Sequence, residues 1–111
     1  MEREIEKLLI DILKAISEIK LFTKGKKFMD FVNDRRLQLI AEREFEIIGE
    51  AMNRLIRINP EIDEIIPDIH KIIGLRNILA HGYDIIEYEI LWDIVENKIK
   101  ILEENINKIK Q

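Results

Sequence analysis

Apolar residues recur at three- and four-residue steps along most of the chain, which is the spacing of an amphipathic α-helix. This pattern predicts helices at Glu2 to about Leu21, Arg35–Ile58, Asp68–Leu79 and Ile85 to about Lys110, with a short amphipathic piece at Lys26–Val32. Much of the apolar mass is isoleucine, which favours strands in isolation, but the helical spacing outweighs that propensity. We therefore expect an all-α bundle of four main helices plus one or two short helices.

Turn-forming and capping residues separate the predicted helices. Thr23-Lys24-Gly25 is expected to form a turn after the first helix. Asn33 or Asp34 can cap the long central helix through a side-chain oxygen. Asp84 and Glu87 have the spacing of a capping box at the start of the last helix. The connections are short turns and not domain linkers, which favours one domain over residues 1–111.

Two features of the predicted helices indicate close packing. Gly49-Glu50-Ala51 interrupts the apolar face of the central helix. Glycine in a helix costs about 1 kcal/mol against alanine, so we expect another helix to approach closely there, while Glu50 can be a plain surface carboxylate. The last helix is apolar on more than a narrow face, which suits a core helix or a dimer interface. Trp92 is accordingly expected in the core or at such an interface.

The composition excludes several kinds of chemistry. The 111-residue chain holds no cysteine, so disulfides, zinc–thiolate sites and cysteine nucleophiles are excluded. His70 and His81 are too few for a histidine-rich metal site, and we expect no metal and no cofactor. The charged start is not a signal peptide, and no apolar run approaches the roughly 20 residues that span a bilayer. The default expectation is a soluble cytoplasmic protein, small enough that an oligomer is reasonable.

The net charge of −4 weakens a general nucleic-acid-binding interpretation, because such domains are usually basic. Local patches matter more than the sum, however, and one region is crowded with basic side chains. They are Lys20, Lys24, Lys26, Lys27, Arg35 and Arg36. Only Asp30 and Asp34 oppose them there. A solvated face and loop is the plainer interpretation of this region, and a nucleic-acid patch is the other.

Candidate chemistry gathers between the last two predicted main helices, in Gly74–Tyr83. This stretch holds Arg76, whose guanidinium never loses its charge, His81, which titrates near neutrality, and the phenol of Tyr83. On an unbroken helix, His81 would lie about 140° round from Arg76, so the side chains would point apart. They can converge if the helix ends near His81, where Gly82 lets the backbone turn, or if a second copy of the chain supplies the partner group.

These residues carry a resemblance to a known family. Arg76-(four residues)-His81-Gly82-Tyr83 matches the R-x4-H-x-Y signature of HEPN-domain ribonucleases, and more narrowly the chain resembles the HepT toxins of HepT–MntA toxin–antitoxin systems. The likeness covers nearly the whole length. Three further stretches carry it, namely Ile48-Gly49-Glu50-Ala51, Gly74-Leu75-Arg76-Asn77 and Leu91-Trp92-Asp93-Ile94. A lone R-x4-H would be weak, but this ordered set is fairly specific.

The resemblance implies a HEPN-type helical bundle that forms a homodimer, with the two motifs around a cleft at the dimer interface. It implies a metal-independent endoribonuclease, the toxin of a type VII system, with RNA as substrate. Arg76 and His81 would be its catalytic residues, and Asn77 would support them. It also implies an MntA-like nucleotidyltransferase antitoxin that neutralises the toxin by AMPylation of Tyr83.

Each of these residues also has a plainer interpretation. His81 could be a helix-end histidine that bonds backbone carbonyls, Arg76 a structural cation and Asn77 a local cap. Tyr83 could pack its ring near the cleft or stack on a base. A second function therefore stays open, a non-catalytic HEPN module that binds a nucleotidyltransferase partner or a nucleotide. His70, outside the motif, is interpreted as an ordinary surface or helix-end residue.

Overall fold

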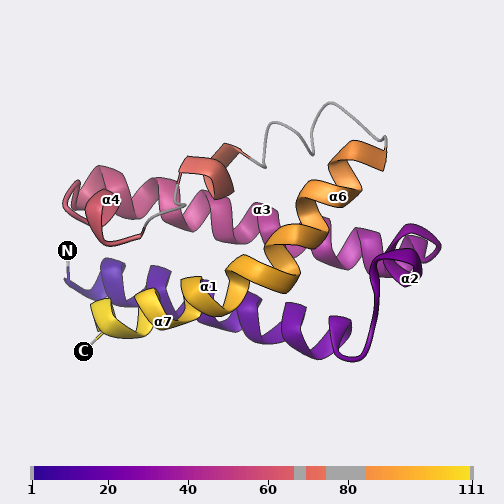
Figure 1. The fold of residues 1–111 in the computed structure, drawn as a ribbon. Coiled ribbons are helices and arrows are strands. Elements are labelled where there is room, and N and C mark those ends of the chain that lie inside the picture. The colour runs from indigo at the N-terminus through magenta and orange to yellow at the C-terminus, as the bar shows by residue number, and fades with distance from the viewer. Residues whose placement is uncertain (1, 67–69, 75–84, 111) are drawn as a thin grey trace.

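The computed structural model describes residues 2–66, 70–74 and 85–110, and the regular structure in these ranges is all helical (Figure 1). The helices are α1 (Glu2–Thr23), α2 (Phe28–Val32), α3 (Arg35–Ile58), α4 (Ile62–Ile65), α6 (Ile85–Asp93), the π-helix η1 (Ile94–Lys98) and α7 (Ile99–Lys110). Residues 70–74 are helical as well. The prediction of an all-α bundle is therefore confirmed.

The described residues form three long helical paths. α1 and α3 lie antiparallel along the long axis, and α2 turns the chain at one end (Figure 1). α6, η1 and α7 follow one another along the third path, which starts beside α2 and ends near the N-terminus of α1. The two termini consequently lie at the same end of a molecule that measures 42 × 27 × 20 Å along its principal axes.

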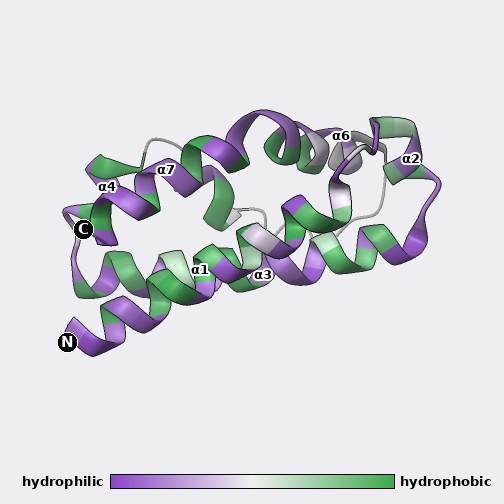
Figure 2. Ribbon diagram, turned by 90° about the horizontal axis from the view of Figure 1, so that it is seen from below, coloured by the Kyte–Doolittle hydropathy of each residue, from purple (hydrophilic) through white to green (hydrophobic). Residues whose placement is uncertain are grey.

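The core forms where α1 and α3 face each other, and the third helical path closes it. On α1 the buried residues are Leu8, Leu9, Ile12, Ala15, Ile16 and Ile19. On α3 the buried apolar side chains are Leu37, Ala41, Phe45, Ile48, Ala51, Met52 and Leu55. These are the apolar faces that the sequence predicts, and Figure 2 shows hydrophobic and hydrophilic residues dividing each long helix. Burying one large apolar side chain contributes roughly 1.5–3 kcal/mol, so this contact is the main hydrophobic seam of the fold.

The turns form largely where the sequence predicts them. Gly25 has a φ of 74°, a left-handed conformation that glycine adopts without steric penalty. The side chain of Asp34 accepts a hydrogen bond from the backbone N–H of Leu37 over 3.1 Å. Of the two predicted caps for α3, Asp34 is therefore the one used. The predicted capping box at the last helix involves Asp84, which lies outside the described residues.

The last helix differs from the prediction at five residues. We predicted one α-helix from Ile85 to about Lys110, and the helical path does cover that range, but Ile94–Lys98 is π-helical. The backbone N–H of Ile99 donates to the carbonyl of Ile94, five residues earlier. Both isoleucines are buried, whereas five residues of α-helix would turn them about 140° apart. The wider turn therefore keeps the buried residues on either side of it facing the core.

Gly49 lies where the helical segment 70–74 crosses α3. A Cβ atom added to this glycine would come within 3.5 Å of the carbonyl oxygen of Ile72 and 3.7 Å of the Cα of Ile73. The predicted close approach of another helix is confirmed, but these are ordinary van der Waals distances that leave room for a Cβ, so the packing does not itself require glycine. Glu50, beside it, is exposed and pairs with Arg54, as expected for a surface carboxylate. The crossing seats the segment that leads toward the R-x4-H-x-Y motif.

Candidate functional site

The predicted site residues Arg76, Asn77, His81 and Tyr83 lie outside the described residues. They belong to the stretch that joins the helical segment 70–74 to α6. The structure describes these two flanks, and the way they are held to the bundle fixes where that stretch starts and where it ends. The geometry of the flanks is therefore what the structure contributes to the candidate site.

The leading flank is held at two points. Ile72 is 1% exposed and lies over Gly49 of α3. At the start of the segment, Nε2 of His70 lies 2.8 Å from Oδ1 of Asp63 in α4. The His70 side chain is otherwise exposed, which confirms its interpretation as a surface residue. One buried aliphatic side chain and one surface hydrogen bond thus attach this flank to α3 and α4.

The following flank is held by aromatic packing. In α6, the ring of Tyr88 meets the ring of Phe31 edge-on, with centroids 5.7 Å apart. Trp92, one turn further on, stacks on the same Phe31 ring at 5.3 Å. Its Nε1–H donates to Oε1 of Glu96 over 2.7 Å. Trp92 is buried within its own chain, so of the two predicted places for it the core is confirmed.

A buried amide completes this anchor. Nε2 of Gln38 donates to the carbonyl oxygens of Phe31 and Val32, each over 2.9 Å, and so satisfies two carbonyls at the end of α2. Its Oε1 accepts from the hydroxyl of Tyr88 at 3.1 Å and from Arg35 at 3.3 Å. The Gln38 side chain is thereby fully used, and it links α2 and α3 to α6, the helix that follows the motif in the sequence.

The sequence reasoning missed Gln38 and Tyr88, although one signal for Gln38 was available. Gln38 precedes Ala41 by three residues and Phe45 by seven, so it occupies a position on the apolar face of α3. A polar side chain at such a position must find hydrogen-bond partners inside the protein. Its spacing therefore predicts a buried polar contact, though not which helix supplies it.

Comparison with known proteins identifies the family. The family model described as "Ribonuclease HepT-like" matches residues 12–109. The chain is 32% identical over 115 residues to "Probable ribonuclease HepT" of Thermococcus cleftensis, a match that covers all of both chains. It is 35% identical over 112 residues to "Putative RNase MJ1380" of Methanocaldococcus jannaschii, covering 99% of this chain and 94% of that one.

This chain belongs to the HepT-like ribonuclease family. The family match takes in both flanks and the whole stretch between them, so the resemblance predicted from the motif is confirmed. No solved structure gives a match. In the described residues of this HepT-like chain, no helix is long and apolar enough to cross a membrane.

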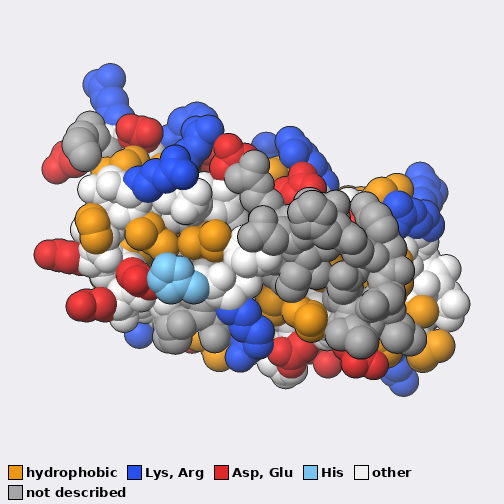
Figure 3. Space-filling view, turned by 90° about the horizontal axis from the view of Figure 1, so that it is seen from above, with side chains coloured by type: hydrophobic (Ala, Val, Ile, Leu, Met, Phe, Trp, Pro, Cys, Tyr) orange, Lys and Arg blue, Asp and Glu red, His pale blue; other side chains and the backbone are white. Residues whose placement is uncertain are grey.

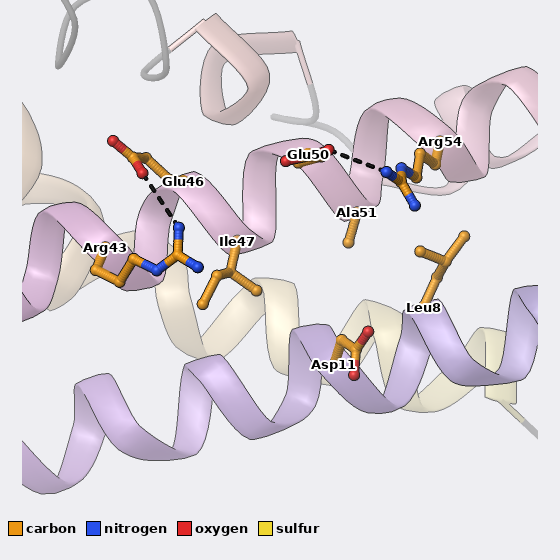
Figure 4. Close-up of a pocket in the computed structure, with 8 residues that line it drawn as sticks. All are labelled: Leu8, Asp11, Arg43, Glu46, Ile47, Glu50, Ala51 and Arg54. Atoms are coloured by element: carbon orange, nitrogen blue, oxygen red, sulfur yellow. Dashed lines mark hydrogen bonds and ion pairs between the residues drawn. The ribbon is translucent and has the colours of Figure 1, made fainter.

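A groove of about 440 Å³ runs between α1 and α3 of this HepT-like chain (Figure 4). Its lining residues are Leu8, Asp11, Arg43, Glu46, Ile47, Glu50, Ala51 and Arg54. Figure 4 shows Arg43 directed at Glu46 and Arg54 at Glu50, with nitrogen–oxygen distances of 3.5 Å and 3.1 Å. In the described residues, no three His, Cys, Asp or Glu side chains are grouped to hold a metal ion. The groove therefore offers no better candidate for the active site than the motif.

One carboxyl group next to this groove has a perturbed pKa. Glu44 of α3 is only 7% exposed, and its Oε2 has no hydrogen-bond partner among the residues that the structure describes. Burial, and then the neighbouring Glu18 of α1, raise the pKa of Glu44 from 4.5 to about 7. Arg43 and Lys14 act in the opposite direction, more weakly. A proton on Glu44 supplies the donor that the pair of carboxylates lacks.

Proposed function

We propose that this chain is a metal-independent endoribonuclease and the toxin of a type VII pair with an MntA-like antitoxin, residues 1–111 forming one HEPN domain. The family match over residues 12–109 carries the proposal, because it spans the motif and both of its flanks. The printed names of the relatives, which contain the words ribonuclease and RNase, support the same chemistry.

The proposed reaction uses the nucleophile that RNA itself carries. The 2′-hydroxyl oxygen attacks the adjacent phosphorus, the bond to the 5′-oxygen breaks, and the products are a 2′,3′-cyclic phosphate and a 5′-hydroxyl. His81 would transfer the proton that must leave the 2′-oxygen or reach the 5′-oxygen, a contribution of typically 10²–10⁴-fold. Arg76 would donate two hydrogen bonds to the phosphate and offset its growing charge. Asn77 would orient His81 or contact the phosphate.

A homodimer would bring the motif side chains together. Helical spacing turns Arg76 and His81 apart on an unbroken helix, whereas two facing copies could bring two arginines and two histidines around one scissile phosphate. One histidine could then act as the base and the other as the acid. We propose that the active form is this dimer.

Neutralisation by the antitoxin has a direct electrostatic reason in this proposal. AMP attached to Tyr83 would place a bulky anion beside Arg76 and His81. That group would occupy the phosphate site and repel RNA. A nucleotidyltransferase partner that modifies this hydroxyl would therefore block substrate binding without any change of fold.

The deciding experiment is cleavage of total cellular RNA by the purified protein in the presence of EDTA. Intact mass must first confirm that Tyr83 is unmodified. We expect cleavage that survives chelation, yields 2′,3′-cyclic phosphate ends and disappears in His81→Ala. His70→Gln is the matched control, because it removes the histidine outside the motif while the glutamine amide can still donate to Asp63. A folded, unmodified dimer that leaves RNA intact would contradict the proposal.

The net charge of −4 favours one alternative, a non-catalytic HEPN module that binds a nucleotidyltransferase or a nucleotide. Expression without an antitoxin separates the two functions. A ribonuclease toxin should slow growth, and His81→Ala should restore it. A binding module should be harmless in both forms.

A further inference from the structure

The charge of this chain is divided unevenly along its length. Residues 20–36, from the last turns of α1 through α2 to the start of α3, carry six basic side chains and two carboxylates, a formal charge of +4. The whole chain carries −4, so the remaining residues carry −8. We call residues 20–36 the basic end. Figure 3 shows basic and hydrophobic side chains together at the end of the molecule where Figure 1 places α2.

The two carboxylates of the basic end are engaged with the backbone. Asp30 accepts a hydrogen bond from the backbone N–H of Lys27 over 2.8 Å at the start of α2. Asp34 accepts from the N–H of Leu37 over 3.1 Å at the start of α3. Both therefore cap helices, and no ion pair joins either of them to a basic side chain in the described part of the chain. The capping role leaves the neighbouring cations available to another molecule.

Four of the six cations are exposed and have no side-chain hydrogen bond or ion pair within the described ranges. They are Lys24, Lys26, Lys27 and Arg36. The other two are exposed as well but have partners within the chain, since Lys20 pairs with Glu103 at 3.1 Å and Arg35 bonds to Gln38 at 3.3 Å. The basic end thus presents to solvent four positive charges that have no partner in the described ranges, on an otherwise acidic protein.

Large apolar side chains are exposed among these cations. Leu21 is 70% exposed, Met29 60% and Phe22 44%. Leu21 and Phe22 lie in α1 and Met29 in α2. Exposing three such side chains to water brings a solvated surface no stability, whereas nucleic-acid surfaces combine cations for the phosphates with apolar or aromatic faces for unpaired bases. This combination is what distinguishes the basic end from an ordinary charged surface.

The basic end also contacts α6, the helix that follows the motif in the sequence. α2 lies within it and packs on α6 through the edge-on contact of Phe31 with Tyr88. α6 in turn begins two residues after Tyr83 in the sequence. A strand of RNA held at the basic end would therefore lie beside the helix that leads out of the proposed catalytic stretch.

We propose that the basic end binds the backbone of single-stranded RNA substrate, with Lys24, Lys26, Lys27 and Arg36 contacting phosphates and Leu21 and Met29 contacting bases. This inference rests on the proposed ribonuclease function. RNA is preferred to an acidic protein because the basic end packs on α6, the helix that follows the proposed catalytic stretch in the sequence. The acidic remainder of the chain repels RNA overall, and the basic end would overcome that repulsion locally by attracting the RNA phosphates.

The test measures binding separately from cleavage. The probe is a short fluorescein-labelled single-stranded RNA made of 2′-O-methyl nucleotides, which lacks the attacking hydroxyl. Its anisotropy is titrated with protein at a series of KCl concentrations. One variant removes the four cations, as Lys24→Gln, Lys26→Gln, Lys27→Gln and Arg36→Gln. The matched control removes three lysines and one arginine elsewhere, as Lys100→Gln, Lys108→Gln, Lys110→Gln and Arg57→Gln, all exposed.

The four-cation variant should bind about ten-fold or more weakly at low salt, and the slope of log K against log[KCl] should flatten by about 2–3, because each phosphate contact on a single strand contributes roughly 0.7. The control should keep both values close to wild type. Leu21→Ser with Met29→Ser should weaken binding and leave the slope unchanged. An unchanged slope in the four-cation variant would overturn the proposal.

Two further readouts separate this inference from the proposed function. If the four-cation variant cuts and binds RNA as wild type does, the ribonuclease stands and the inference fails. If wild type binds the probe through the basic end but cuts no cleavable RNA, the inference stands and the function fails. If the variant keeps its affinity for RNA and loses affinity only for a co-expressed nucleotidyltransferase, the surface serves an acidic protein and the inference is wrong.

Discussion

The hydroxyl of Tyr88 in α6 donates a 3.1 Å hydrogen bond to Oε1 of Gln38, a buried side chain of α3. The same amide satisfies the carbonyls of Phe31 and Val32 at the end of α2. One residue therefore connects α2 and α3 to α6, and its partner Tyr88 comes five residues after Tyr83 in the sequence. Both the nitrogen and the oxygen of the Gln38 amide have hydrogen-bond partners. These bonds fix the position of α6 more narrowly than apolar packing alone, because a shift of α6 would leave a buried polar group without a partner.

Gln38→Leu should destabilise the protein by about 2–3 kcal/mol, since the two carbonyls and the tyrosine hydroxyl would each lose a partner in a buried site. Tyr88→Phe should cost only about 1 kcal/mol, because Gln38 keeps its other hydrogen bonds. Urea unfolding followed by circular dichroism measures both. Asn97→Ala is the control, as it removes an exposed amide bonded to Asp93, and should stay within about 0.5 kcal/mol. Equal effects of Gln38→Leu and Asn97→Ala would refute this role.

The sequence predicted the apolar faces of α1 and α3, a cap at Asn33 or Asp34 and the close packing at Gly49, because each follows from local spacing or backbone geometry. It did not predict the partners of Gln38, since a buried polar contact between helices depends on which helices meet. The π-helix was missed for a related reason. The five-residue step from Ile94 to Ile99 conflicts with an α-helix only once both residues are known to face the core. The motif residues remain predictions from the sequence and the family.

The raised pKa of Glu44 makes stability depend on pH in a definite direction. Its pKa is about 7 in the folded protein against 4.5 in the unfolded chain, so the folded state binds more protons between these values. The free energy of unfolding should therefore rise as the pH falls from about 8 toward 5. Glu44→Gln removes the charge and should stabilise the protein at pH 8 by on the order of 2 kcal/mol, with little effect near pH 4.

Thermal melts of wild type and Glu44→Gln at matched pH values measure this difference. Glu50→Gln is the control, because that carboxylate is exposed and paired with Arg54. Its effect should be small and nearly independent of pH. A Glu44→Gln effect that stays constant from pH 5 to pH 8 would show that the seam between α1 and α3 does not hold a shared proton.

Substitutions at Gly49 should separate helix propensity from packing. In Gly49→Ala the new Cβ would sit 3.5 Å from the carbonyl of Ile72, an ordinary contact, so the gain in helix propensity of up to about 1 kcal/mol should appear. Gly49→Leu should instead destabilise by roughly 1–3 kcal/mol, since the segment 70–74 must move away. Glu50→Leu adds the same side chain one residue further along α3 and should have a small effect. If Gly49→Leu were tolerated equally well, the crossing would not constrain the leading flank.

Trp92 should be the largest single aromatic contribution to the following flank. It is 5% exposed, stacks on Phe31 at 5.3 Å and donates to Glu96 at 2.7 Å. Trp92→Ala should cost about 3–5 kcal/mol because it leaves a cavity between α2 and α6. Trp92→Phe keeps the ring contact and loses the hydrogen bond, so its cost should be about 1–2 kcal/mol.

Phe22→Ala, at an exposed aromatic of α1, is the control and should have little effect. Because Trp92 is the sole tryptophan, these melts require circular dichroism. Similar stabilities of Trp92→Ala and Phe22→Ala would show that α6 is held by other contacts.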